Sequence, residues 1–387
     1  MKFIENNICA PRGFKAVGKT IGLKVSGKPD FTVIFSEVLA DAAAVYTSNK
    51  VKGAPLVVTK KHLENGKAQA IAVNSGVANV CTGNKGIKDA EDTAKLVGNE
   101  LEINPNNVLV ASTGLIGAFM PMGKITDGIK EIKNELKTKS DAAKAILTTD
   151  KAEKEIAVKV DNFTIGAIAK GSGMVHPNMA TMLCFITTDA KMPQKKLISF
   201  LKNSVNKSFN MMSVDMDTST SDMVTIIANG LAGKVDEKKF QEALDCVCIN
   251  LAKKIAKDGE GATKLIEVEA KNAATKNDAE KLAKSIITSN LVKCAVFGND
   301  PNWGRLMCAI GNSNAEFQEN KVSIYFGDKI IVNKGTSVNF NLNEVKNIMK
   351  NDELKIIIDL NNGKENATAY GCDMTEKYVK INAHYTT

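Results

Sequence analysis

Segments with the hydrophobic pattern of strands alternate with segments that have the pattern of helices along almost the whole chain. Short apolar runs at residues 70–74 and 108–112 are typical of buried strands. The segment between them has apolar residues at every third or fourth position, as on one face of a helix: Ile87, Ala90, Ala94, Val97 and Leu101. This alternation indicates an α/β fold with a mixed sheet.

The same reasoning predicts three more helices and a last third rich in strands. Each helix is marked by apolar positions on one face: Ile125, Ile129, Ile132 and Leu136; Leu197, Phe200, Leu201 and Val205, entered through Pro193; and Phe240, Leu244, Val247, Leu251 and Ile255. Strands are expected at residues 266–270, 322–326, 329–332 and 354–359, and residues 378–387 end the chain on a strand-like pattern.

The composition is that of a globular protein. The 387 residues are enough for two ordinary domains or one large layered domain. Hydrophobic residues make up 44% and charged residues 24%, which argues against disorder, collagen-like repeats and coiled coils. The net charge of +8 is spread along the chain, and the lysine-rich stretches 130–144 and 191–207 have the spacing of solvated helix faces. We therefore expect no nucleic-acid partner.

The sequence also points to a cytoplasmic location. No window approaches the ~18 apolar residues of a membrane span, and residues 1–7 lack the apolar core of a signal peptide. The eight cysteines include no Cys-x-x-Cys pair, which predicts reduced, buried thiols. Neither membrane insertion nor secretion is indicated.

Two motifs for nucleotide binding are incomplete. Residues 22–29 approach a Walker A loop, but Pro29 stands where a serine or threonine would hold magnesium, and a strand-like run follows in place of a helix. Gly171 and Gly173 begin a dinucleotide fingerprint, but His176 replaces its third glycine. Neither segment predicts a nucleotide site.

No metal or cofactor is predicted either. The three histidines lack metal-site spacing. Asp215, Asp217 and Asp222 form a candidate cation cluster, but the hydroxyl residues between them favour a hydrogen-bonded turn before a strand at residues 223–228. The single tryptophan, Trp303, fits loop packing and a substrate-pocket wall equally well.

Residues 170–183 are unlike the rest of the chain. A glycine-rich loop and a proline precede Ala180 and Thr181, and an apolar strand follows at residues 182–186. A threonine hydroxyl is a poor nucleophile, but cleavage between Ala180 and Thr181 would free an α-amine beside it. Such an amine titrates near ~7.7–8.0, which suits a base at neutral pH. The residues alone also fit a glycine-rich turn before a core strand, so both interpretations stay open.

The segment Lys170-Gly-Ser-Gly-Met-Val-His-Pro-Asn-Met-Ala-Thr-Met-Leu183 closely resembles the self-cleavage signature of the glutamate N-acetyltransferase/ornithine acetyltransferase family of arginine biosynthesis. Five more stretches agree in order and spacing: residues 74–79, 112–117, 146–150, 258–264 and 297–305. The resemblance covers nearly the whole chain. It implies a layered α/β/β/α fold of the N-terminal-nucleophile type, cleaved into an alpha chain (1–180) and an intertwined beta chain (181–387).

The resemblance further implies a ping-pong acetyltransferase without a cofactor, in which Thr181 takes acetyl from N-acetyl-L-ornithine and passes it to L-glutamate. Thr113 and Gly114 match the family's oxyanion-stabilising pair. The positions that match its substrate contacts are Thr148, Lys170, Thr181, Glu260, Asn382 and Thr387. Bifunctional members also use acetyl-CoA as a donor, and the resemblance suggests a heterotetramer of two alpha and two beta chains.

Two alternatives to this function stay open. An N-terminal-nucleophile amidohydrolase or aminopeptidase would use Thr181 in the same way but with water as the acceptor. A non-catalytic small-molecule binding protein would use the glycine-rich loop only as a turn. Met216 and Ser221 depart from the family pattern, which more often has Gly and Asn, and this departure is expected to affect turn geometry without touching an assigned catalytic residue.

Overall fold

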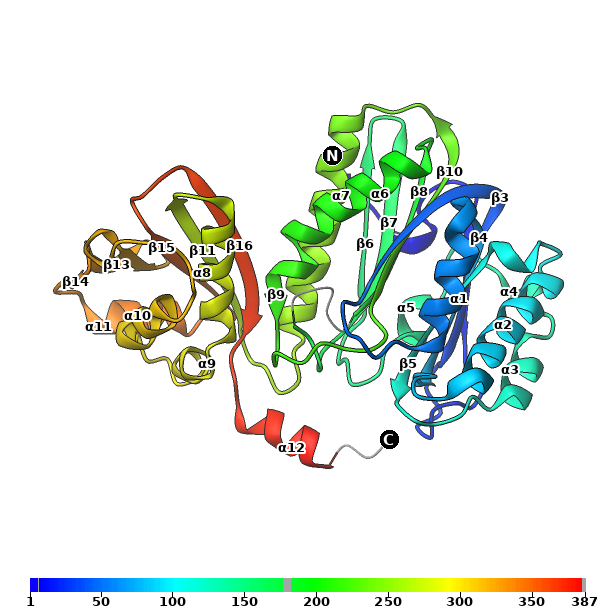
Figure 1. Ribbon diagram of the computed structural model, residues 1–387, viewed down its shortest axis with the longest axis horizontal. Helices are drawn as coiled ribbons and strands as arrows, with labels where there is room; N and C mark the ends of the chain where they lie inside the picture. The colour runs from blue at the N-terminus through cyan, green and yellow to red at the C-terminus, as the bar shows by residue number, and fades with distance from the viewer. Residues whose placement is uncertain (6, 177–181, 385–387) are drawn as a thin grey trace.

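The computed structural model describes residues 1–5, 7–176 and 182–384, which form a large lobe and a small lobe side by side (Figure 1). The described strands of the large lobe make one nine-stranded sheet in the order β1-β6-β7-β8-β10-β3-β4-β5, with β2 beside β3. Their bounds are β1 Lys2–Phe3, β2 Phe14–Lys19, β3 Phe31–Tyr46, β4 Lys67–Val77, β5 Val108–Leu115, β6 Lys154–Val160, β7 Phe163–Lys170, β8 Leu183–Ala190 and β10 Met223–Gly233.

This sheet folds over on itself at the long strand β3. The first half of β3 pairs with β2 and β4, its second half pairs with β10, and the register with β4 shifts between Phe35 and Ala40. The two halves of the sheet face each other across a shared core. Buried residues from both halves meet there: Ile34, Ile71 and Leu109 from one, and Ile168, Phe185 and Ile227 from the other. The result is two β layers in contact.

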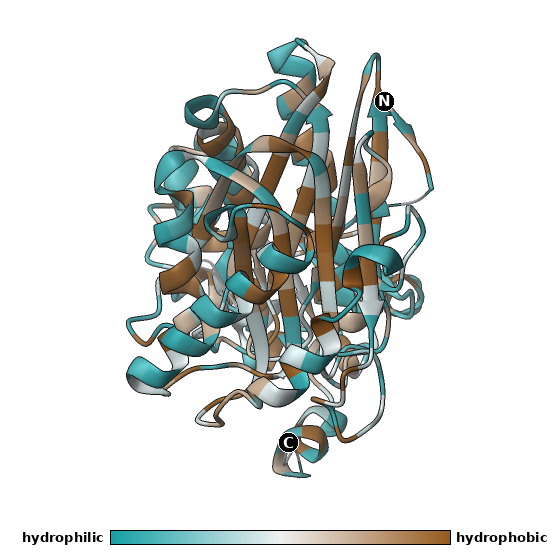
Figure 2. Cartoon of the chain, turned by 90° about the vertical axis from the view of Figure 1, so that its right-hand side faces the viewer, coloured by the Kyte–Doolittle hydropathy of each residue, from teal (hydrophilic) through white to brown (hydrophobic). Residues whose placement is uncertain are grey.

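Helices cover the outer faces of both β layers. The helices α6 Gln194–Lys207 and α7 Glu237–Lys257 pack on β6, β7 and β8. The opposite side carries α1 Ala54–His62, α2 Gly83–Glu100, α3 Met122–Ile129 and α4 Ile132–Glu135, while α5 Ala142–Ala145 joins the core between the layers. Figure 2 shows hydrophobic strands inside and hydrophilic outer helix faces. The layered α/β/β/α arrangement implied by the family resemblance is confirmed.

The small lobe is built on a second sheet, which has seven strands in the described part of the chain. Its order is β14-β13-β12-β15-β11-β16-β9. The bounds are β9 Met212–Ser213, β11 Leu265–Ala273, β12 Ser323–Phe326, β13 Lys329–Asn333, β14 Thr336–Ser337, β15 Glu353–Asp359 and β16 Glu365–Cys372. The same lobe contains the helices α8 Lys276–Thr288, α9 Asn290–Phe297, α10 Trp303–Gly311 and α11 Leu342–Met349. Trp303 packs against the hydrophobic core of this lobe, which supports loop packing over a substrate-pocket wall as the role of this residue.

Two predicted elements were wrong. The helix expected through Leu136 is broken, because Glu131 adopts a left-handed conformation (φ 61°) between α3 and α4. The lysine-rich stretch 130–144 is therefore only partly helical.

The C-terminal segment is a helix, α12 Glu376–His384, although Val379, Ile381 and the residues around them alternate like a strand. None of the described strands pairs with this segment, and its less exposed residues, Tyr378 and Ile381, are spaced as on a helix face.

The sequence analysis predicted buried thiols and no membrane span, and the cysteines and helices of the structure relate to these two predictions. All eight cysteines are free, but Cys81, Cys294 and Cys308 are exposed, so the prediction of uniformly buried thiols was wrong. Within the described residues, none of the helices combines the length and the apolar character needed to cross a bilayer.

Candidate active site

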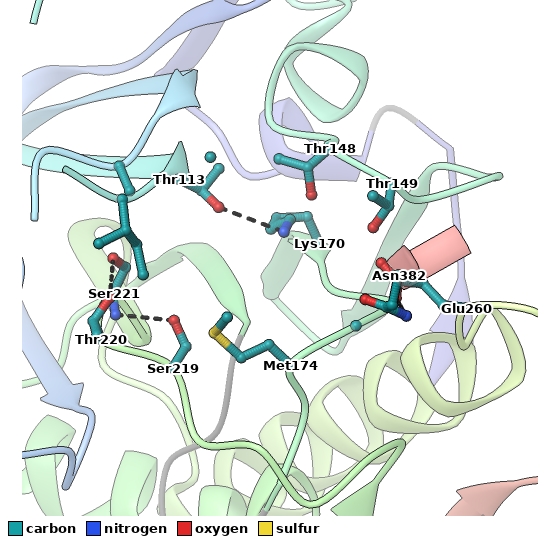
Figure 3. Close-up of a pocket in the computed structure, with 14 residues that line it drawn as sticks. Thr113, Thr148, Thr149, Lys170, Met174, Ser219, Thr220, Ser221, Glu260 and Asn382 are labelled. Atoms are coloured by element: carbon teal, nitrogen blue, oxygen red, sulfur yellow. Dashed lines mark hydrogen bonds between the residues drawn. The ribbon is translucent and has the colours of Figure 1, made fainter. Parts of the chain in front are cut away.

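A cavity lies where residues from distant parts of the chain converge (Figure 3). The space between its lining residues measures about 650 Å³ and includes open solvent. Its lining residues are Ala78, Thr113, Gly114, Ile116, Thr148, Thr149, Lys170, Gly173, Met174, Ser219, Thr220, Ser221, Glu260 and Asn382. Six of the residues singled out by the family resemblance are therefore brought together.

The ends of several strands meet at this cavity. Lys170, the last residue of β7, is the register partner of Leu183, the first residue of β8. Leu183 is also the partner of Met223, which begins β10. Ala180, Thr181 and Thr387, also expected in the site, lie outside the described residues.

Thr113 and Lys170 approach each other inside the cavity. The Lys170 Nζ lies 3.5 Å from the Thr113 Oγ1, and both side chains are buried. Burial lowers the pKa of Lys170, while Asp150, Asp222 and Glu260 act in the opposite direction and favour its charged form. The site thus holds a buried lysine with three carboxylates that favour its charged form, and in that form it suits an anionic group of a substrate.

Gly114 follows Thr113 in β5 and its backbone permits only glycine. Its φ is +126°, and a Cβ there would collide with the backbone of Gly76 on β4. The two residues expected to stabilise an oxyanion therefore stand next to each other on the cavity wall, one offering a hydroxyl and the other a backbone N–H.

Asp150 organises the wall that carries Thr148 and Lys170. Its Oδ2 accepts the Thr148 N–H at 3.0 Å, and its Oδ1 accepts the Gly171 N–H at 2.7 Å and the Lys154 Nζ at 2.6 Å. Burial alone would raise the pKa of Asp150, but Lys170 and Lys154 outweigh it and hold this pKa below its usual range. Asp150 is therefore an enclosed carboxylate that balances the charge of the buried lysines.

Glu260 and Asn382 form the opposite side of the cavity. The Glu260 N–H donates to the Ser172 carbonyl at 2.8 Å, which holds the segment after α7 against the glycine-rich loop. Asn382 Nδ2 donates to Glu260 Oε2 at 2.8 Å, so the C-terminal helix α12 reaches the cavity. A carboxylate here suits a cationic group of a substrate.

The structure adds cavity residues that sequence reasoning missed. Ser219, Thr220 and Ser221 line the cavity, so the departure at Ser221 concerns the cavity wall and not only a turn. The carboxylates of this stretch bind backbone amides: Asp215 accepts from Met174 and Val175 at 2.6 and 2.8 Å. The signal was present in the sequence as a run of small hydroxyl residues between aspartates, but it is also typical of an ordinary turn.

The loop at residues 22–29, which approaches a Walker A motif, binds a carboxylate of the same chain. The buried Asp30 carboxylate accepts the N–H groups of Ile21, Leu23 and Lys24 at 2.7, 2.6 and 3.0 Å. These amides are the groups that such a loop would offer to a phosphate, so the loop is occupied by a side chain of the same protein.

Comparisons with known proteins agree with this geometry. The ArgJ family matches residues 15–387. The chain is 46% identical over 402 residues to the arginine biosynthesis bifunctional protein ArgJ of Symbiobacterium thermophilum, with 100% of both chains covered. It is 48% identical over 404 residues to the arginine biosynthesis bifunctional protein ArgJ 1 of Clostridium acetobutylicum, covering 100% of this chain and 99% of the relative.

A solved structure is also similar. The crystal structure of the arginine biosynthesis bifunctional protein ArgJ from Bacillus halodurans has a TM-score of 0.50 and 42% identity, covering 51% of this chain and 97% of that chain. Together with the match over residues 15–387 and the full-length relatives, this similarity establishes the family of the chain. The chain belongs to the ArgJ family of arginine biosynthesis enzymes.

Proposed function

We propose that this enzyme moves an acetyl group from N-acetyl-L-ornithine to L-glutamate through an acetyl-threonine at Thr181. The observation that carries the proposal is the arrangement of one cavity with Thr113 and Gly114 on one wall, the buried Lys170 ammonium beside them, and the Glu260 carboxylate opposite. A hydroxyl and a backbone N–H suit a developing oxyanion, while separated positive and negative groups suit an amino-acid substrate.

The chemistry needs two half-reactions. The Thr181 Oγ attacks the acetyl carbonyl carbon, the amide C–N bond breaks, and the proton lost by Oγ passes through the Thr181 α-amine to the leaving ornithine nitrogen. The glutamate amine then attacks the acetyl ester, and Oγ leaves and recovers a proton. Hydroxyl and amine supply the nucleophile and the base, so the proposed transfer uses no metal or cofactor.

The Thr181 α-amine exists only after cleavage between Ala180 and Thr181. Supporting this step, the Bacillus halodurans chain is matched over 97% of its length by 51% of this chain, as a piece of about half its length would be. Denaturing electrophoresis of the purified protein should give two bands, with the second sequence starting at Thr181. The Thr181→Ala variant should stay one uncut and inactive chain.

One experiment separates transfer from the hydrolytic alternative. The enzyme is incubated with N-acetyl-L-ornithine carrying a labelled acetyl group, with and without L-glutamate. We expect labelled N-acetylglutamate only when glutamate is present, and without it an enzyme piece heavier by one acetyl group. Rapid release of labelled acetate regardless of glutamate would instead establish an amidohydrolase.

The assembly, the location and the range of donors are part of the same proposal. We propose two copies of each piece per enzyme, a cytoplasmic site of action, and acetyl-CoA as a second acetyl donor. Light scattering of the cleaved protein measures the assembly. Formation of N-acetylglutamate from acetyl-CoA and glutamate alone tests the second donor.

A further inference from the structure

Lys154, the first residue of β6, is a buried lysine that joins two carboxylates. Its Nζ donates to Asp150 Oδ1 and to Asp258 Oδ2, at 2.6 Å each, and to the Ala152 carbonyl at 3.2 Å. The Lys154 side chain is 1% exposed, whereas every other lysine or arginine that forms an ion pair in the described part of the chain is at least 22% exposed. Because buried charges are screened much less than surface charges, this lysine constrains its partners more strongly than a surface ion pair would.

The two carboxylates belong to opposite walls of the cavity. Asp150 holds the backbone beside Lys170, because it accepts the N–H of the residue that follows this lysine. Asp258 is the C-cap of α7 and stands two residues before Glu260. Lys154 is bonded to both carboxylates, so it links the wall that carries Lys170 to the wall that carries Glu260.

This link crosses the proposed cleavage site. Lys154 precedes the site in the chain, and its strand pairs with β7 in a register that places Lys154 opposite Ala169. Asp258 and Glu260 follow the site. After a cut, the two walls would belong to different pieces, and noncovalent bonds such as those of Lys154 would set the spacing between them.

We propose that Lys154 is a positioning residue that sets substrate specificity: its bonds to Asp150 and Asp258 fix the separation between the Lys170 and Glu260 side chains, and this separation selects the length of the acetyl donor. The donor would place its α-carboxylate at Lys170 and its side-chain ammonium at Glu260. N-acetyl-L-ornithine has three methylenes between its α-carbon and its ammonium, and Nα-acetyl-L-lysine has four. The inference rests on the proposed function, because it concerns the choice of donor in that reaction.

The charges of this network also explain why it can be loosened without collapsing. Two carboxylates, Asp150 and Asp258, are balanced by two lysines, Lys154 and Lys170. Without Lys154, Asp150 keeps two backbone N–H donors and the charge of Lys170, and Asp258 keeps the backbone N–H groups of residues 151–152. Neither carboxylate would be left without donors, so we expect a variant that lacks Lys154 to fold.

The test compares N-acetyl-L-ornithine with Nα-acetyl-L-lysine as acetyl donors, with L-glutamate as the acceptor. In Lys154→Met, the ratio of the two kcat/KM values should fall about tenfold from its wild-type value, the low end of the discrimination that one methylene provides. KM for N-acetyl-L-ornithine should rise while its kcat changes little, since the link acts on the fit of the substrate and not on the oxyanion donors of β5.

Two further variants assign the effect to the link itself. Asp258→Ala breaks the same link from the other wall and leaves in place the charges of Asp150 and Lys154, which both act on Lys170. It should lower the donor ratio as Lys154→Met does, and it carries the measurement if Lys154→Met folds poorly. The matched control is Lys264→Met, which removes a buried lysine whose Nζ donates only to residues of the small lobe outside the cavity lining. It should keep the wild-type ratio.

The outcomes separate this inference from the proposed function. A wild-type donor ratio in cleaved Lys154→Met and Asp258→Ala enzymes would overturn the role of Lys154 while leaving the acetyl transfer intact. Equal use of both donors by the wild-type enzyme, or an equal fall of the ratio in Lys264→Met, would overturn it too. So would folded but uncleaved chains in both link variants, since the link would then act in maturation. Absence of glutamate-dependent transfer in the wild-type enzyme would instead refute the proposed function itself.

Discussion

The Lys170 Nζ lies 3.5 Å from the Thr113 Oγ1, although the two residues are 57 positions apart in the sequence. The contact joins β7 and β5, which belong to opposite layers of the folded sheet. Because the ammonium stands beside the hydroxyl, the pair concentrates positive potential on one wall of the cavity. A carbonyl oxygen that gains negative charge there would be stabilised.

Replacing Thr113 by alanine should lower kcat by about 10²–10³, because an oxyanion donor acts mainly where charge develops in the transition state. Thr113→Ser, which keeps the hydroxyl, is the matched control and should retain most of the activity. Steady-state kinetics with N-acetyl-L-ornithine and glutamate measure both. A raised KM with unchanged kcat in Thr113→Ala would make the residue a binding group.

The fall of kcat/KM at high pH, the basic limb of the pH profile, should reflect the deprotonation of Lys170. Because burial lowers its pKa, the residue loses its charge at a lower pH than the ordinary value of ~10.4, and kcat/KM should fall as the pH rises through the lowered pKa. In Asp150→Asn a carboxylate that favours the charged lysine is gone, so this limb should move to still lower pH. A basic limb that stays in place in Asp150→Asn would exclude Lys170 as its source.

A methyl group at position 173 should disturb the opposite wall. A Cβ on Gly173 would collide with the carboxyl group of Glu260, so Gly173→Ala should displace this side chain and break its 2.8 Å bond to Asn382. We expect KM for N-acetyl-L-ornithine to rise about tenfold, as for a lost hydrogen bond to a charged group. Gly123→Ala, where a Cβ meets nothing within 4 Å, is the control.

The C-terminal helix should matter for activity more than for folding. Asn382→Ala removes the bond to Glu260, and deletion of residues 385–387 removes Thr387, so each change should lower kcat/KM, by about tenfold for Asn382→Ala. The unfolding transition should change little, since no residue of α12 is fully buried. Full specific activity in a cleanly cleaved, truncated enzyme would remove the C-terminus from the site.

Asp222 should lower the stability of the uncut chain, because burial raises its pKa well above the ordinary value. Between about pH 4 and its raised folded-state pKa, the folded chain retains a proton that the unfolded chain releases, so the free energy of unfolding should fall as the pH rises. Urea unfolding of Thr181→Ala across this window measures the slope. Adding Asp222→Asn should flatten it and raise stability at neutral pH; an unchanged slope would assign the pH dependence elsewhere.

The sequence predicted most of the fold, because its elements carry strong local patterns. The apolar stripes of α2, α6 and α7 and the buried runs of β4 and β5 were found at nearly their observed positions. The failures came from local conformations with weak signals. Glu131 takes a left-handed conformation that its residue type does not favour, and the alternation around Val379 lies in a segment with which none of the described strands pairs.

The site was less predictable than the fold. Family motifs named Thr113, Lys170 and Glu260, which do meet in one cavity. The supporting carboxylate of Asp150 was not recognised, and Asp222 was interpreted as part of a turn, since their roles depend on burial and on bonds to backbone amides next to other strands. Such bonds depend on sheet order, which local patterns do not encode.

The sheet order has a consequence for the lifetime of the enzyme. β8 and β10 lie between β7 on one side and β3 on the other, so a cut between residues 180 and 181 leaves the two strands of the later piece flanked on both sides by strands of the earlier piece. Withdrawing them would require two antiparallel ladders to be broken at once. Under the proposed cleavage, maturation would be a one-way event: halves of different age would not exchange between molecules, and a damaged half would be replaced only by synthesising the whole chain again.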